Sequence, residues 1–267
     1  MIRLGLKHLE FSGLQMKSIF KSLLLLIALS AVPVFAQTDF EATKARAESG
    51  DAEAQHNLGV MYENGESVAW DNQEAVRWYR LAAEQGNASA QINLGKMYRD
   101  GAGVSRDDNA ALKWFLSAAE QGEVNAQLEL GNMYDIGSGV AENDQEAVKW
   151  YRFAAEQGHA QGQYFLGVMY EEGNGLAQND QEALRWYRLA AEQGFVSAQY
   201  SLGWMYSDST GIAQNYQKAY VWFSVIAAQG YDAGPRDRIR QQLSPQSLEQ
   251  AQAQATRCLE SNYQDCD

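Results

Sequence analysis

The chain has 267 residues, of which 46% are hydrophobic and 21% are charged. This composition excludes an intrinsically disordered chain and supplies enough apolar residues for a sizeable core. Its 34 acidic and 21 basic residues give a net charge of −13. Such an acidic chain repels phosphate backbones, so nucleic acid is not expected as a partner.

The first 36 residues have the region order of a secretory signal peptide. Basic residues come first, an apolar run over 22–32 follows, and small residues end the segment at Ala36. This order predicts export and cleavage after Ala36, with translation starting at Met1 or Met16. The apolar run is shorter than the roughly 20 residues that a membrane span needs, which disfavours a transmembrane anchor. We therefore expect a periplasmic or secreted protein without a membrane span after cleavage.

Residues 37–50 are predicted to form an N-terminal capping helix. Thr38 or Asp39 can serve as its N-cap, and Gly50 closes it. The segment matches the second half of the units that follow, but Ala42 stands where each of those units has tryptophan. A polar, degenerate half-unit suits the end of a repeat array, because a terminal unit has only one neighbour to pack against.

One phrase, an aromatic pair followed by small residues and a glycine, recurs five times at a spacing of 36 residues. In the first unit it runs from Trp78-Tyr79 to Gly86. A fixed period of this length is the signature of a solenoid, which here predicts an all-α architecture of helix-loop-helix repeats. The predicted repeats are 51–86, 87–122, 123–158, 159–194 and 195–230.

Each repeat contains two helical patterns joined by a glycine-bearing loop. In the first repeat, Leu58 and Tyr62 belong to one apolar face with a period of 3.6 residues. Gly65 follows as a C-terminal cap, and Asp71 with Glu74 forms a capping-box pattern at the second helix. A glycine inside the first helix of every repeat implies the close approach of a neighbouring helix backbone.

After residue 230 the pattern fades into predicted C-terminal capping helices within 231–267. Pro235 and Pro245 suit the first positions of two polar helices. Cys258 and Cys266 follow, and an exported chain with an even number of cysteines favours a disulfide between them. The alternative is two free thiols.

The five units resemble Sel-1-like repeats, a branch of the tetratricopeptide superfamily. The shared pattern is Ala-Gln-x-x-Leu-Gly-x-Met-Tyr, a Gly-x-Gly-Val loop, and Ala-x-x-Trp-Tyr/Phe-x-x-Ala-Ala-x-Gln-Gly, and it covers residues 51–230. Gly162, Ser67 and Ile226 are the main departures. The resemblance implies a right-handed α/α superhelix that acts as a scaffold or adaptor, with a protein or peptide as partner.

No pattern in the chain indicates catalysis, a cofactor or a metal. His56 and His159 are nearly three repeats apart and cannot share a metal ion, and no nucleophile-elbow, zinc-protease, phosphate-loop or calcium-loop motif is present. We therefore expect a monomeric, non-catalytic protein-interaction module. The alternative is a cell-wall- or β-lactam-related hydrolase or binder, because some cysteine-rich relatives of the repeat family have that role. Those relatives carry a disulfide in each repeat, which residues 51–230 lack.

The resemblance also implies that the first helix of each repeat lines a concave groove. Two outward positions of this helix vary while the frame around them stays constant, and they become large and apolar toward the C-terminus. Exposed apolar and aromatic residues of this kind mark binding sites. The predicted groove residues are His56, Val60, Ile92, Lys96, Leu128, Asn132, Tyr164, Val168, Tyr200 and Trp204. The alternative is that these side chains pack on one another or on the terminal cap.

Overall fold

The computed structural model describes residues 39–208 and 211–266, so the predicted signal peptide lies outside the described residues. The described residues are helical and contain no strand, which confirms the all-α prediction. They divide into two compact units, one made of 39–90 with 102–104 and the other of 91–101 with 105–266. Each unit is built from paired helices of the predicted repeats.

The first unit contains a helix over 39–48 and the helix pair of the first repeat. This pair is α2 (Ala52–Asn64) and α3 (Asn72–Glu84). Its core joins Phe40 and Ala47 to Ala54, Leu58 and Trp78. The N-terminal helix therefore covers the apolar face of the first repeat, as a cap must.

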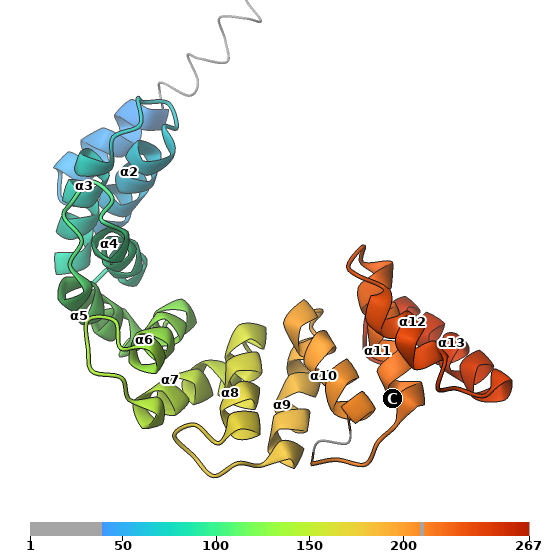
Figure 1. Ribbon diagram of the computed structural model, residues 1–267. Coiled ribbons are helices and arrows are strands. Elements are labelled where there is room, and N and C mark those ends of the chain that lie inside the picture. The colour runs from blue at the N-terminus through green and yellow to red at the C-terminus, as the bar shows by residue number, and fades with distance from the viewer. Residues whose placement is uncertain (1–38, 209–210, 267) are drawn as a thin grey trace, which may run out of the picture. The chain divides into compact units, whose positions relative to one another are not determined.

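Consecutive helix pairs make up most of the second unit, as Figure 1 shows for α6 to α11. The second helix of each repeat here packs against the first helix of the next, as α7 does on α8 and α9 on α10. The helices of the second to fifth repeats are α4 (Ala88–Asp100), α5 (Asp108–Ala119), α6 (Val124–Ile136), α7 (Asp144–Glu156), α8 (Ala160–Glu172), α9 (Asp180–Ala191), α10 (Val196–Asp208) and α11 (Tyr216–Ala228).

The glycine inside each first helix makes room for an aromatic ring, and this corrects the expectation of a neighbouring backbone. A Cβ atom added at Gly167 would lie 2.7 Å from Cδ1 and Cε1 of Tyr187, in the second helix of the same repeat. Gly95 faces the Phe115 ring in the same way. The glycine of the first helix therefore packs directly against the aromatic ring of the second helix.

The capping signals form only half of the predicted capping box. Oδ1 of Asp71 accepts hydrogen bonds from the amides of Gln73 and Glu74, as expected. The amide of Asp71 itself donates to the carbonyl of Tyr62 at 2.9 Å, so Glu74 is not needed there and pairs with Arg77 instead. This backbone bond fixes the loop between the two helices of the repeat.

A pair of glutamines links the two helices of each repeat, which the sequence reading did not anticipate. Nε2 of Gln193 donates to Oε1 of Gln163 at 2.8 Å, and Nε2 of Gln163 donates to the carbonyl of Ala155 in the preceding repeat. Gln163 is buried, so these bonds satisfy an amide that would otherwise destabilise the core. The recurrent glutamines of the motif therefore stabilise the packing within and between repeats.

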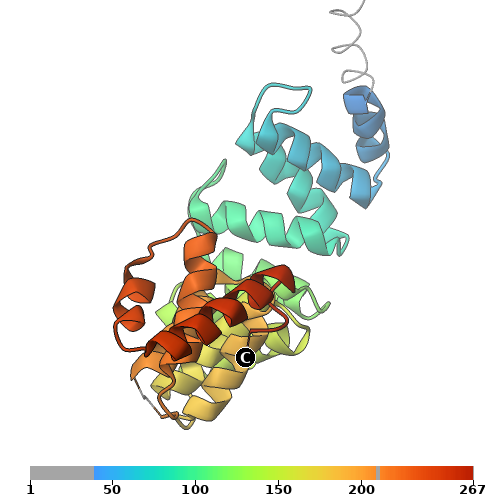
Figure 2. The ribbon, with the colours of Figure 1, turned by 90° about the vertical axis from the view of Figure 1, so that its right-hand side faces the viewer.

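The chain ends in α12 (Gly234–Arg240) and α13 (Pro245–Glu260), both in contact with α11 (Figure 2). Cys258 of α13 is buried, and Cys266 lies at disulfide-bonding distance, with the two Cα atoms 4.4 Å apart. The segment between them contacts the α9–α10 turn, where Nε2 of Gln264 donates to the carbonyl of Glu192 at 2.9 Å. No helix in the described ranges is both long and apolar enough to cross a membrane.

We expect the double variant Cys258→Ser with Cys266→Ser to lose less than about 3 kcal/mol of stability, because a bond that closes so short a loop restricts the unfolded chain only slightly. The loss should be local, with faster hydrogen exchange in α13 and the segment 261–266 and unchanged exchange in α6 to α9. Alkylation of the native protein without reductant provides the direct check. Labelling of both thiols would contradict the disulfide.

Candidate functional site

The predicted groove residues fall into two groups in the structure. Ile92 and Leu128 are buried in the hydrophobic clusters between helices, so they contribute to packing and offer little surface. The others are half-buried. His56 and Val60 belong to the first unit, where the His56 ring lies 5.8 Å from that of Tyr79. The partly exposed groove residues of the second unit are Lys96, Asn132, Tyr164, Val168, Tyr200 and Trp204.

Tyr164 of α8 stands at the centre of a group of aromatic rings. Its ring centroid lies 5.5 Å from Phe165, 5.6 Å from Tyr187 and 5.3 Å from Phe195. Phe165 in turn stacks on Tyr151 at 4.9 Å. Tyr151 and Tyr187 are buried, whereas Tyr164, Phe165 and Phe195 are half-buried. We refer to these last three residues as the aromatic surface.

The sequence reading missed two members of this surface, Phe165 and Phe195. Position 165 is polar in the other repeats, where it reads Asn57, Asn93, Glu129 and Ser201. A single aromatic residue at an otherwise polar position was the available signal.

Phe195 occupies the N-cap position of α10, and its carbonyl accepts from the amide of Gln199. In the first two repeats this position holds Asp51 and Asn87, whose side chains accept helix amide hydrogen bonds, whereas Glu123 and His159 in the next two repeats form no such bond. Phenylalanine cannot do so, and losing such a cap costs about 1 kcal/mol. At the start of α10 the chain therefore has an aromatic ring that contacts Tyr164 in place of a capping side chain.

Two tyrosine–carboxylate pairs border the aromatic surface. The Tyr151 hydroxyl donates to Oδ1 of Asn132 at 2.8 Å and lies 3.3 Å from Oδ2 of Asp135, and the Tyr187 hydroxyl donates to Oε2 of Glu171 at 2.5 Å. Burial raises the pKa of both phenols far above the usual range, so both stay protonated donors. Burial also raises the pKa of the Asp135 carboxyl, although its hydrogen bond with Tyr151 opposes that shift.

From repeat to repeat, the aromatic residue of the second helix and the residue 16 positions before it change together. Repeats with tyrosine in the second helix carry an acid 16 positions earlier, as Glu63 does for Tyr79. Where the ring is Phe115 or Phe223, the corresponding position holds Arg99 or Ser207. The acid is therefore present where a phenol can donate to it.

The C-terminal cap covers part of the predicted groove. The guanidinium of Arg238 in α12 lies 5.3 Å from the centroid of the Trp204 ring, and the Tyr200 hydroxyl lies 3.5 Å from the carbonyl of Asp232. Trp204 also packs edge-on against Phe223 at 5.2 Å. One side of the Trp204 ring therefore packs on the C-terminal cap, which was the alternative to an open groove position.

A family model described as the Sel1 repeat matches residues 52–87, 88–123, 124–159, 160–195 and 196–231. The chain belongs to the Sel1 repeat family. No curated protein matches it. Among solved structures, the Sel1 repeat protein from Oxalobacter formigenes is 29% identical with a TM-score of 0.65, and the match covers 82% of this chain and 96% of that one.

Two further solved structures are similar to this chain at lower identity. A protective antigen present in uropathogenic Escherichia coli strains is 24% identical with a TM-score of 0.41, covering 85% of this chain and 81% of that one. An immunity protein from Pseudomonas aeruginosa is 24% identical with a TM-score of 0.44, covering 74% and 75%.

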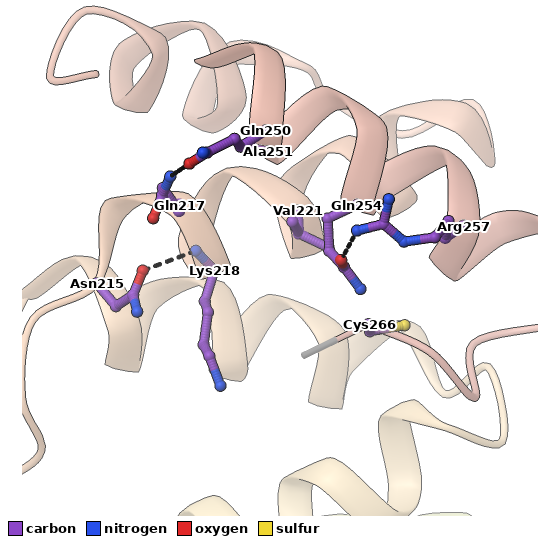
Figure 3. A pocket seen from close by; sticks show the side chains of 9 residues that line it. All are labelled: Asn215, Gln217, Lys218, Val221, Gln250, Ala251, Gln254, Arg257 and Cys266. Atoms are coloured by element: carbon purple, nitrogen blue, oxygen red, sulfur yellow. Dashed lines mark hydrogen bonds between the residues drawn. The ribbon is translucent and has the colours of Figure 1, made fainter. Parts of the chain in front are cut away.

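One cavity of this Sel1 repeat chain lies between α11 and α13 and has a volume of about 350 Å³. Four of its polar side chains bond in pairs: Gln217 donates to Oε1 of Gln250 at 2.9 Å, and the guanidinium of Arg257 donates to Oε1 of Gln254 (Figure 3). These polar groups of the cavity therefore already have partners within the chain.

A second cavity, of about 430 Å³, borders the aromatic surface at Phe195 and also touches His159 and Gln157. The buried Nδ1 atom of His159 has no hydrogen-bond partner in the described part of the chain. In the same described ranges, no group of three or more His, Cys, Asp or Glu side chains could hold a metal ion.

Proposed function

We propose that this Sel1 repeat chain is a non-catalytic interaction module that binds a protein or peptide partner, with Tyr164, Phe165 and Phe195 at the centre of the contact. The observation that carries the proposal is the continuity of three half-buried rings on a frame that does not require them. Tyrosine and other large aromatic residues dominate the binding energy of protein interfaces. Rings already held by neighbours also lose little conformational freedom on binding.

The half-buried predicted groove residues of the second unit, Lys96, Asn132, Val168, Tyr200 and Trp204, extend the proposed contact along the first helices of that unit. We further propose that the protein acts in the periplasm or outside the cell. The region order of the first 36 residues and the cysteine pair at disulfide distance support this location. We propose a monomer as the active form.

We expect the variant Tyr164→Ala with Trp204→Ala to bind its partner at least about 2 kcal/mol more weakly, which is the usual scale for aromatic hot spots. Partners are first captured from an envelope extract on the wild-type chain and identified by mass spectrometry. Isothermal titration with the purified partner then measures the affinity of each variant.

Phe153→Ala is the matched control, because Phe153 is an aromatic residue of α7 that is 43% exposed and lies outside the aromatic surface. Thermal unfolding of the double variant should resemble that of this control more than that of Trp186→Ala in the core. A double variant that stays folded and binds with wild-type affinity would show that the contact lies elsewhere.

A further inference from the structure

The carboxylates beside the aromatic surface carry negative charge that no neighbouring side chain neutralises. In the described ranges, neither Asp135 nor Glu171 forms an ion pair with lysine or arginine, and each receives a tyrosine hydroxyl instead. A carboxylate offers about four acceptor positions, so a single phenol leaves most of them open. Asp144 and Glu142 add negative charge near Asp135 and act to raise its pKa further.

The second repeat shows how the chain fills the same positions when it supplies the cation itself. There Arg99 stands where Asp135 and Glu171 stand in later repeats, and its Nη1 lies 2.5 Å from Oε2 of Glu129. Glu129 occupies the position of Phe165 in the next repeat. One repeat further along, Asp135 and the half-buried ring of Phe165 replace this Arg–Glu pair, and no basic residue stands at either position.

Both components of this surface attract a basic side chain. Lysine and arginine interact favourably with aromatic faces and form charge-assisted hydrogen bonds with carboxylates. The chain already makes such contacts within its own fold, where the guanidinium of Arg185 lies 4.6 Å from the centroid of the Trp186 ring. The net charge of −13 also favours the approach of a cationic segment.

We infer that the partner presents an extended, basic peptide segment, with a lysine or arginine side chain over Tyr164 and Phe165 and its charge directed toward Asp135 and Glu171. This inference rests on the proposed function, since it assigns the chemistry of the partner at the same surface. The tyrosine hydroxyls hold the two carboxylates in place, and the aromatic rings contact the aliphatic stem of the basic side chain.

The test uses random linear peptides displayed on phage and selected on the immobilised wild-type chain. We expect the selected peptides to be enriched in lysine or arginine next to apolar residues. A selected peptide is then synthesised with its lysine or arginine and again with norleucine at that position, which retains an aliphatic stem and removes the charge. The norleucine peptide should bind at least about tenfold more weakly at low salt, the scale of the coupling energies measured for some close charge pairs at interfaces.

The matching protein variant is Asp135→Asn with Glu171→Gln, which removes both charges and keeps an oxygen that accepts from each tyrosine. It should reduce affinity for the basic peptide by about tenfold or more and leave affinity for the norleucine peptide nearly unchanged. Glu63→Gln is the control, because it alters the equivalent tyrosine–acid pair of the first repeat, where the next repeat has Asn93 in place of Phe165. It should bind both peptides as the wild type does.

Three outcomes bear on this inference and on the proposed function. If peptides lose affinity with Tyr164→Ala but show no preference for basic residues and no effect of the charge variants, the basic segment is wrong and the interaction surface stands. If no selected peptide depends on Tyr164 and the chain does not dimerise through this surface, both are overturned. Concentration-dependent dimerisation that Tyr164→Ala abolishes, without such peptides, would identify a second copy of the chain as the occupant and would also overturn the inference.

Discussion

Replacing Trp186 with alanine should lower the free energy of unfolding by about 3–5 kcal/mol, the range for removing a large aromatic residue from a core. Trp186 is only 8% exposed and shares a hydrophobic cluster with Leu128 of α6 and Leu166 of α8. Its loss therefore leaves a cavity between two repeats. Since a repeat array is stabilised by contacts between neighbours, this change weakens the interface as well as the repeat.

The Trp186 prediction is checked by urea unfolding followed by circular dichroism, with hydrogen exchange as a second probe. The indole nitrogen of Trp186 has no hydrogen-bond partner in the residues that the structure describes, so the expected loss comes from packing and from the contact of the ring with the Arg185 guanidinium. Phe153→Ala is again the control and should cost less than about 1 kcal/mol, as exposed positions usually do. A Trp186→Ala loss as small as that of the control would refute the assignment of this ring to the core.

We expect Gly167→Ala to destabilise the chain by about 1–3 kcal/mol, although alanine is the better helix former by about 1 kcal/mol. The added methyl group would lie 2.7 Å from two carbons of the Tyr187 ring. That ring is fully buried, and its hydroxyl is bonded to Glu171, so it cannot move away without losing contacts. Overpacking should therefore exceed the gain in helix propensity.

A double-mutant cycle isolates the Gly167 contact. In a Tyr187→Ala background the clash is absent, so Gly167→Ala should become neutral or slightly stabilising. The measurement is again the free energy of unfolding from urea titrations. An equal loss in both backgrounds would mean that the glycine is required for a reason other than the ring.

The aromatic surface shows where sequence reasoning about the site was sufficient and where it was not. Tyr164 was predicted because it varies within a constant frame, and its neighbour Phe165 carried the same signal at the next position. Ile92 and Leu128 also vary within the constant frame, yet the structure buries both side chains. Variation between repeats identifies a position that the frame leaves open, but it does not say whether the next repeat covers that position.

The sequence by itself determined the helical repeat, because the 36-residue period, the apolar faces and the cap residues are all local patterns that act within a few helical turns. It also indicated the cysteine pair, since both residues lie in one short terminal segment. Only the tertiary structure decided what each repeated residue contacts. Gly167 meets a ring rather than a backbone, Gln193 bonds to Gln163 thirty positions away, and Arg238 covers one side of Trp204. These contacts depend on how the two helices of a repeat and the terminal cap pack in space, and residues distant along the chain supply the partners.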